Sequence, residues 1–367
     1  MCWQPPEELA CPLRFNSWTK AFPSPPLCIK QISEANAGSA KGADIVVGSL
    51  TDITDMRTAM AGARRAYFCV PNEAGYLKAA AIFTVVAAEH NLETVVAMSQ
   101  WLSNPNHPAI HTREVWLADR LFALLPGTAV TYINVGFFAD NEMQVLPFAA
   151  QFGLLSLPYG TGLNAPPSNE DIARVVAEIL ARPEGHAGKT YRPTGPKLLS
   201  PQDVAAILGK VLGCKVTYRN APMRMVSKMM RGRLSLYALA AYSQYVIDYQ
   251  KNAFGVNAPT DVVRRITGRE PEDYETIARR YAATTPGVRR SFALQFKLML
   301  GMITALLRPA PKTAPYLALD EFSDRSHVVF SADSPEWRHS HESQANESSA
   351  ESPEVWHAHS GMEGKKA

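Results

Sequence analysis

Polar side chains that could do chemistry lie at the end of an apolar stretch and at the start of the helix predicted after it. Ser99 closes the stretch LETVVAMSQ, and its hydroxyl can both donate and accept a hydrogen bond. His111 and Arg113 follow in HTREVW. A histidine can act as an acid near neutral pH, and an arginine can steady a phosphate or a ribose as a fixed cation. The alternative is ordinary residues at a helix N-terminus, with His111 and Glu114 as a local pair.

Metal and thiol chemistry find little support in the sequence. The five cysteines form no C-x-x-C pair, so we interpret them as reduced thiols and predict a cytoplasmic protein. Paired histidines in SPEWRHSH (334–341) and SPEVWHAH (352–359) could bind a soft metal adventitiously. The stretch that holds them is polar and is better explained as a disordered tail. No metal site is predicted.

A glycine-rich phosphate-binding turn is not found where such a turn is expected. The stretch GTGLNAP (160–166) imitates G-x-G-x-x-A, but it does not lie between a strand and a helix of a first βαβ unit. Gly38 is the only glycine before Gly42. Because such a turn and the helix after it hold a pyrophosphate, the sequence offers no visible loop for one.

Alternating strands and helices from residue 42 to about residue 141 predict the elements that position these side chains. Strands are predicted at 44–47, 66–70, 92–99 and 129–138, with a helix after each of the first three. Repeated βαβ units imply a parallel sheet with right-handed crossovers. The predicted fold class is therefore α/β: a Rossmann-like parallel sheet, incomplete at its N-terminus, with a smaller C-terminal α/β subdomain and a disordered tail.

Five regions are predicted along the chain. They are an atypical segment at 1–41, a Rossmann-like core at 42–150, a substrate-side subdomain at 151–285, an amphipathic helical extension at 286–322 and a disordered tail at 323–367. Polar, Ser-, Glu- and His-rich composition defines the tail.

Composition excludes two classes of partner. Hydrophobic residues make up 46% of the chain, the net charge is +3, and the basic residues are scattered, which argues against direct binding of nucleic acid. The N-terminus shows no apolar signal-peptide region. The apolar run 291–307 carries Lys297 and is shorter than the roughly 20 residues of a spanning helix, so no integral membrane segment is predicted. We expect an amphipathic helix packed on the protein; the alternative is a helix that lies on a membrane face or on a partner.

Several stretches resemble the NmrA-like branch of the atypical short-chain dehydrogenases/reductases. The most diagnostic are DIARVVAEILARPEGHAGKTY with the TGP after it, and ITGREPEDYETIARRY; the resemblance runs from about Gly42 to Ala283. It implies a Rossmann domain that binds NAD or NADP and a smaller subdomain over the nicotinamide. It also implies either an NAD(P)H-dependent reductase of quinones or azo compounds, or a catalytically silent redox sensor. The expected partner is a small-molecule substrate or a regulatory protein.

The resemblance assigns cofactor-binding residues to the ends of the predicted strands. They are Ser49, Leu50, Cys69, Val70, Pro71, Ser99, Gly136 and Phe137. Ser49 stands where the family has an aspartate beside the adenine amine; the alternative is a turn serine. Ser99 stands where typical reductases place a catalytic serine, and Gln100 and Trp101 could bind or stack on a nicotinamide or a substrate ring. Arg113 stands where many members carry a lysine, so Ser99, His111 and Arg113 are the weak catalytic candidates.

Two elements of the family pattern are missing. No tyrosine has a lysine four residues later, the pair that donates a proton in typical short-chain dehydrogenases, and the N-terminal glycine-rich segment is missing. Three interpretations follow: an NAD(P)H-dependent oxidoreductase, a silent redox-sensing regulator that acts through a protein partner, or a truncated product with impaired cofactor binding. We adopt the first.

Overall fold

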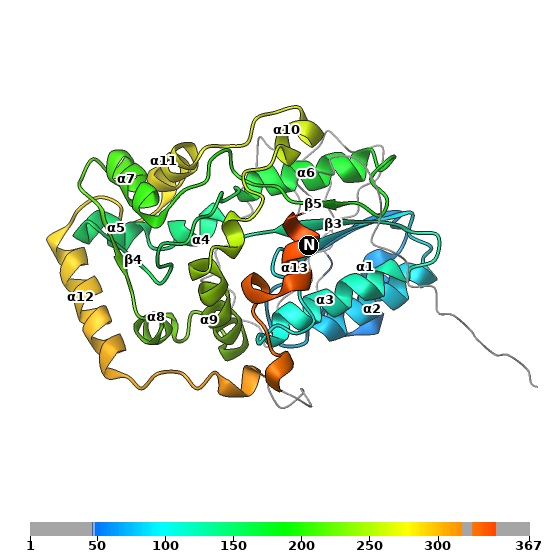
Figure 1. Cartoon of the computed structure of the whole chain (residues 1–367), viewed down its shortest axis with the longest axis horizontal. Coiled ribbons are helices and arrows are strands. Elements are labelled where there is room, and N and C mark those ends of the chain that lie inside the picture. The colour runs from blue at the N-terminus through cyan, green and yellow to red at the C-terminus, as the bar shows by residue number, and fades with distance from the viewer. Residues whose placement is uncertain (1–45, 47, 318–324, 343–367) are drawn as a thin grey trace, which may run out of the picture.

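A four-stranded parallel sheet forms the centre of the computed structural model, which describes residues 46, 48–317 and 325–342 (Figure 1). The sheet order is β1-β2-β3-β5. The strands are β1 (Arg65–Phe68), β2 (Thr94–Gln100), β3 (Ala129–Val135) and β5 (Thr190–Tyr191). In the longest pairing, Thr94 of β2 lies opposite Ala129 and Gln100 lies opposite Val135. The predicted parallel α/β sheet is therefore confirmed.

Helices cover both faces of this sheet, which explains why β2 is almost continuously apolar. Val95 and Ala97 join a core with α2 (Tyr76–Glu89) and α3 (Ile110–Ala123). Val96, which points to the opposite face, joins a core with α6 (Asn169–Ala181). The helices α1 (Ile53–Met60) and α10 (Val262–Thr267) extend these two layers.

A second core lies to the left of the sheet in Figure 1 and contains a two-stranded parallel sheet. Its strands are β4 (Leu154–Leu157) and β6 (Thr217–Asn220), and its helices are α4 (Ala139–Met143), α5 (Leu146–Phe152), α7 (Pro201–Leu212), α9 (Leu236–Gln250) and α11 (Tyr274–Thr284). The helix α8 (Met223–Met230) packs on α9 and has no buried residue. Ser200 and Asp203 form a capping box at the start of α7, as the sequence indicates. Because α6 and β5 return to the first sheet, residues of the predicted subdomain 151–285 contribute to both cores.

The helical extension forms α12 (Phe292–Leu307), which lies along the left edge of the molecule in Figure 1. It packs on α5 and α8, and none of its residues is fully buried. No helix within the described ranges combines the length and the apolarity needed to cross a membrane.

One prediction about the chain termini is corrected by the structure, and others concern residues outside the described ranges. The disordered tail predicted from residue 323 does not hold for residues 325–342, which form short 3-10 turns and the helix α13 (Pro335–Glu342). Trp337 drives this order, because its large side chain is buried in the second core. The rest of the predicted tail, the segment 1–41 and most of the strand at 44–47 lie outside the described residues; the described Val46 has no strand assignment.

Candidate functional site

The candidate site lies at the carboxyl ends of β1 and β2, where the N-termini of α2 and α3 approach the sheet. In open parallel α/β sheets ligands bind outside the carboxyl ends of the strands. Here Ser99 and Gln100 end β2, and His111 and Thr112 begin α3. Tyr245 of α9 approaches from the second core, so the site lies where the two cores meet.

The buried Ser99 forms a pair with the half-buried Asp119 of α3. Its Oγ donates a hydrogen bond of 2.6 Å to Asp119 Oδ2, while Asp119 Oδ1 has no partner. Burial raises the pKa of Asp119 to about 7, and the bond from Ser99 opposes that rise. Asp119 can therefore hold or release a proton near neutral pH. The sequence signal for this pair is the position of Asp119 between the buried Val115 and Phe122 on one face of α3.

Three further polar groups are buried at the same edge without a hydrogen bond. They are Gln100 Oε1, Thr112 Oγ1 and the Tyr245 hydroxyl. Thr112 and Gln100 lie close enough to the Tyr245 hydroxyl to oppose the rise in its pKa that burial causes, but none of these contacts meets the distance and angle of a hydrogen bond. In the loop after β1, Asn72 Oδ1 is likewise buried and unpaired. A buried polar group without a partner costs about 1–3 kcal/mol, so such a group typically marks strain or a place where a polar ligand binds.

His111 is buried in an aromatic pocket, which argues against the acid role predicted for it near neutral pH. Its ring lies edge-on to Tyr76, with centroids 4.7 Å apart, and near the ring of Tyr237. Burial lowers the pKa of His111 to about 3, so the imidazole is neutral at physiological pH. Tyr237 instead donates a hydrogen bond of 2.5 Å to Glu114 Oε2. The expected local pair of His111 and Glu114 is thus bridged by a tyrosine from α9.

Arg113 holds the loop between β2 and α3 in place through hydrogen bonds to its backbone. Its Nη1 donates to the carbonyl oxygen of His107 at 2.8 Å and that of Pro108 at 3.4 Å. The side chain is buried, so these bonds fix the course of the chain into α3. The structure therefore gives Arg113 a positioning role, and its predicted contact with a ribose or a phosphate stays a prediction.

His107 in the same loop is a site residue that the sequence did not reveal. Its Nδ1 accepts a bond from the Ala109 amide, so its Nε2 carries the hydrogen and donates to Asp248 Oδ2 at 2.8 Å. Both side chains are fully buried. Asp248 Oδ1 in turn accepts from the Ala332 amide, 2.8 Å away. No local pattern could indicate this contact, because its members lie 141 residues or 84 residues apart.

The residues predicted at the ends of the first two strands, 49–50 and 69–71, make local turn contacts or pack in the core. Ser49 lies in a turn, where its Oγ accepts from the Thr51 amide at 3.2 Å, which favours the turn-serine alternative. Leu50 and Val70 pack against the core of the first sheet. Burial raises the pKa of the Cys69 thiol, so Cys69 is not a reactive thiolate. The cofactor contacts assigned to these residues and to Pro71 stay predictions.

Phe137 lies in the interior of the second core, and Gly136 before it is half-buried. The Phe137 ring is 7% exposed and lies among the rings of Tyr159, Tyr242, Tyr249 and Phe254 at centroid distances of 5.4–6.1 Å. A Cβ atom added to Gly136 would lie 3.4 Å from Phe254. Their predicted contact with a cofactor therefore requires these aromatic side chains to move.

Trp101, which was expected to be able to stack on a nicotinamide or a substrate ring, is covered by the C-terminal segment 325–342. Arg192 lies over one face of its indole at 3.5 Å from the centroid, and the rings of Trp337 and His341 approach edge-on. Trp337 Nε1 donates to the Trp101 carbonyl oxygen at 2.9 Å. In Figure 1 the helix α13 accordingly lies beside the carboxyl ends of the strands.

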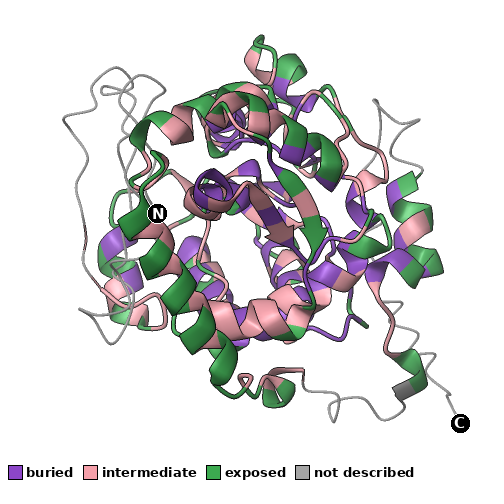
Figure 2. Cartoon of the chain, turned by 90° about the vertical axis from the view of Figure 1, so that its left-hand side faces the viewer, coloured by how far each residue is buried: buried purple, intermediate pink, exposed green. Residues whose placement is uncertain are grey.

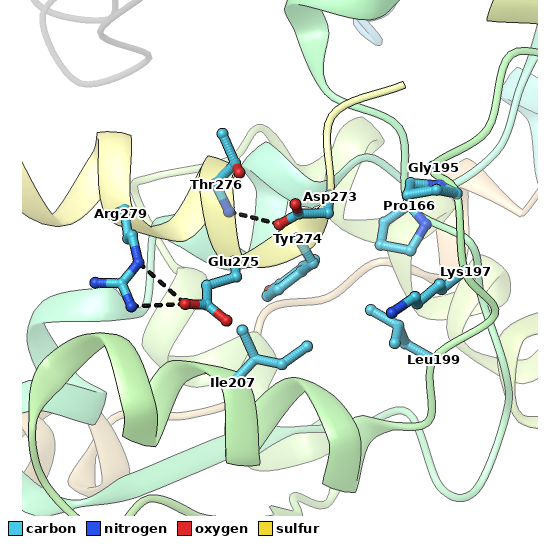
Figure 3. A pocket seen from close by; sticks show the side chains of 11 residues that line it. Pro166, Gly195, Lys197, Leu199, Ile207, Asp273, Tyr274, Glu275, Thr276 and Arg279 are labelled. Atoms are coloured by element: carbon cyan, nitrogen blue, oxygen red, sulfur yellow. Dashed lines mark hydrogen bonds and ion pairs between the residues drawn. The ribbon is translucent and has the colours of Figure 1, made fainter. Parts of the chain in front are cut away.

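A pocket of about 430 Å³ lies away from these residues, between α7, α11 and the loop 195–199 (Figure 3). Its carboxylates are engaged: Asp273 caps α11 by accepting from the Thr276 amide, and Glu275 pairs with Arg279 and Lys210. None of the predicted site residues lines it. We therefore place the candidate site at the carboxyl edge and not in this pocket.

The chain was compared with protein-family models, with curated proteins and with solved structures. No protein-family model matches the chain. Over 261 residues it is 24% identical to an NAD(P)H azoreductase of Xenophilus azovorans, which covers 70% of this chain and 88% of that protein.

Two solved structures have folds similar to that of this chain. An NADPH-dependent quinone oxidoreductase of Escherichia coli, complexed with NADPH, matches with a TM-score of 0.56 and 20% identity, covering 65% of this chain and 83% of that one. NmrA, a negative transcriptional regulator in complex with NADP, matches with a TM-score of 0.50 and 17% identity, covering 64% and 78%. The chain therefore shares the Rossmann-like fold of these two solved structures, which agrees with the α/β fold class predicted from its sequence.

Proposed function

We propose that this protein is an NAD(P)H-dependent oxidoreductase that transfers a hydride to an electron-poor organic acceptor of the quinone or azo class. The observation that carries the proposal is the set of buried, unpaired polar atoms of Gln100, Thr112 and Tyr245 at the carboxyl edge of a parallel sheet. Similarity to an azoreductase and to a quinone oxidoreductase supports the reaction class.

The unpaired atoms fit a polar ligand such as the nicotinamide end of the cofactor. An amide and two hydroxyls can both donate and accept hydrogen bonds, which suits a carboxamide or a ribose hydroxyl. When bound, the nicotinamide would supply the hydride. A glycine-rich turn for the pyrophosphate is not among the described residues at this edge, so the support is confined to one end of a dinucleotide.

The Ser99–Asp119 pair is the part of the site that can accept or donate a proton near neutral pH. Because the pKa of Asp119 is about 7, its carboxyl is partly protonated at neutral pH, and Ser99 Oγ is held 2.6 Å from it. Asp119 thereby fixes the direction of the Ser99 hydroxyl. His111 is neutral at this pH and plays no acid role in the proposal.

A regulatory function is the second candidate, and one observation favours it. The segment 325–342 covers Trp101, so Trp101 is not free to contact a substrate in this conformation. A protein that binds a cofactor without turnover would use the site as a sensor and act through a protein partner. In either case we expect it in the cytoplasm, as the unpaired cysteines suggest.

Two assays separate these candidates. Calorimetric titration with NADH and NADPH measures binding, and oxidation of the bound species by menadione or an azo dye measures turnover. We expect Gln100→Leu to weaken binding about tenfold, since it removes one hydrogen-bonding group. Gln202→Leu, the same change at an exposed position, serves as the control. Binding without turnover would assign the regulatory function.

A further inference from the structure

The outer face of α12 presents an apolar stripe that the described residues leave uncovered. Eleven large hydrophobic side chains are exposed among the described residues, and seven of them belong to this one helix. They are Phe292, Phe296, Met299, Leu300, Ile303, Leu306 and Leu307. Phe292 is 90% exposed and Leu307 is 81% exposed. Figure 2, which looks at the side of the molecule where α12 lies, shows the helix exposed along its length.

The spacing of these residues makes them a single surface. Counted from Phe292, they follow at i+4, i+7, i+8, i+11, i+14 and i+15, which is one stripe of an α-helix. The half-buried residues Leu294, Leu298 and Met302 lie on the other side and pack on the protein. A helix that is apolar on all sides is normally buried on all sides. The outer stripe of α12 therefore indicates a surface that something else covers.

Positive charge surrounds the stripe. Residues 285–317 contain five basic residues and 221–247 contain four, and neither segment contains an aspartate or a glutamate. α8, in the second segment, packs on α12. Lys228 Nζ donates to the Leu306 carbonyl oxygen at 2.6 Å, and Arg231 donates to that of Pro309, so both cations lie at the C-terminal end of α12.

Four further cations lie at the ends and on the flank of α12. Arg289 and Arg290 precede the helix, whereas Lys297 lies on its flank and Arg308 follows its last turn. Their side chains reach past an apolar surface easily, because the stems are hydrocarbon and only the tips need water. An apolar stripe bordered by lysine and arginine alone is the pattern of a helix that lies in the interface of an anionic bilayer.

We propose that α12 docks this protein on the surface of a membrane that contains anionic lipids. The apolar stripe would enter the boundary between headgroups and acyl chains, and the surrounding cations would lie among the phosphates. A second copy of the chain fits this surface less well, because a two-fold contact would bring the same cations face to face.

Co-sedimentation of the full chain with vesicles tests the proposal. The probes are vesicles of phosphatidylcholine with phosphatidylglycerol and vesicles of phosphatidylcholine alone, each at low and at high salt. We expect binding to the anionic vesicles that is at least about tenfold stronger than to the neutral ones and that weakens with salt. Equal binding to both vesicles, or binding to neither, would overturn the proposal.

Two triple variants make the test specific. Phe292→Ser, Phe296→Ser and Leu307→Ser together should abolish anionic-vesicle binding, and the exposure of these side chains leaves the fold intact. Val85→Ser, Leu117→Ser and Leu124→Ser remove the same kind of exposed side chain from α2 and the end of α3 and should leave binding unchanged. If both triple variants reduce binding equally, the contact is unspecific and the proposal fails.

A second pair of measurements separates lipid from protein as the occupant. Lys297→Glu with Arg308→Glu should weaken vesicle binding about tenfold or more while the apolar stripe stays whole. Light scattering without lipid should give one mass for the wild type and for the serine variant. A wild-type dimer that the α12 serine variant dissociates would assign the stripe to a second copy of the chain and overturn the lipid proposal.

Discussion

Replacing Asp119 with asparagine should change how the free energy of unfolding depends on pH. Burial raises the pKa of Asp119 from 3.8 to about 7, so the folded protein binds this proton more tightly than the unfolded chain does. Between those two values the folded state carries more protons, and its stability therefore falls as pH rises, with no further loss above about pH 7. Asparagine cannot ionise, but its oxygen can still accept the bond from Ser99.

The size of the effect follows from the difference between the two pKa values. One pKa unit corresponds to about 1.4 kcal/mol, so ionisation of Asp119 costs the folded state about 4 kcal/mol in total. About 3 kcal/mol of this should appear between roughly pH 5 and pH 8. Burial also raises the pKa of Glu142 to about 7 and lowers that of His111 to about 3, so only the difference between wild type and variant isolates Asp119.

Urea unfolding at several pH values between about 5 and 8 measures this difference. We expect the free energy of unfolding of Asp119→Asn, minus that of the wild type, to grow by about 3 kcal/mol across the range. Asp261→Asn makes the same chemical change at an exposed position and is the control. A difference that stays constant with pH would show that the Asp119 carboxyl ionises freely and would refute the reasoning from burial.

Three further substitutions test the contacts around the site. Trp337→Ala should release the segment 325–342 from Trp101, so that limited proteolysis cleaves this segment faster than in Trp337→Phe; equal rates would show that the indole does not hold the segment. Asp248→Asn should lower the free energy of unfolding in urea by about 1–3 kcal/mol, because its single amide oxygen can accept from only one of the two buried donors, His107 Nε2–H and the Ala332 amide; an unchanged free energy would contradict this pairing. Gly162→Ala should destabilise the second core in thermal unfolding, since the added Cβ would lie 1.9 Å from the Tyr249 carbonyl oxygen; an unchanged Tm would contradict the close approach.

The sheet was predictable because its signals are local. Apolar runs such as TVVAMSQ alternate with helices of strong helix formers, and Ser168 and Ser200 cap their helices as their positions indicate. The cap of α1 shows the limit of such reasoning: Asp52 and Thr54 are both residue types that cap helices, and it is Asp52 that accepts the bonds from the amides of Thr54 and Asp55. Boundaries depend on which of several polar neighbours reaches the amides.

The site was less predictable because its contacts join distant residues. Ser99 could be placed from its strand, but its partner Asp119 was identified only from the structure. Tyr245 and His107 depend on the packing of α9 against the first core, which no spacing along the chain encodes. The polar composition of the segment after residue 323 hid the packing of Trp337, because one buried aromatic side chain can hold a helix of eight residues.

Calorimetric titration of the full chain with NADPH and with NADH tests the central claim most directly. If the polar atoms at the carboxyl ends of β1 and β2 bind a dinucleotide, NADPH or NADH should bind saturably. Binding should also raise the Tm with cofactor concentration. A chain that unfolds cooperatively and yet gives neither a binding isotherm nor a shift in Tm with either dinucleotide would contradict the proposed function.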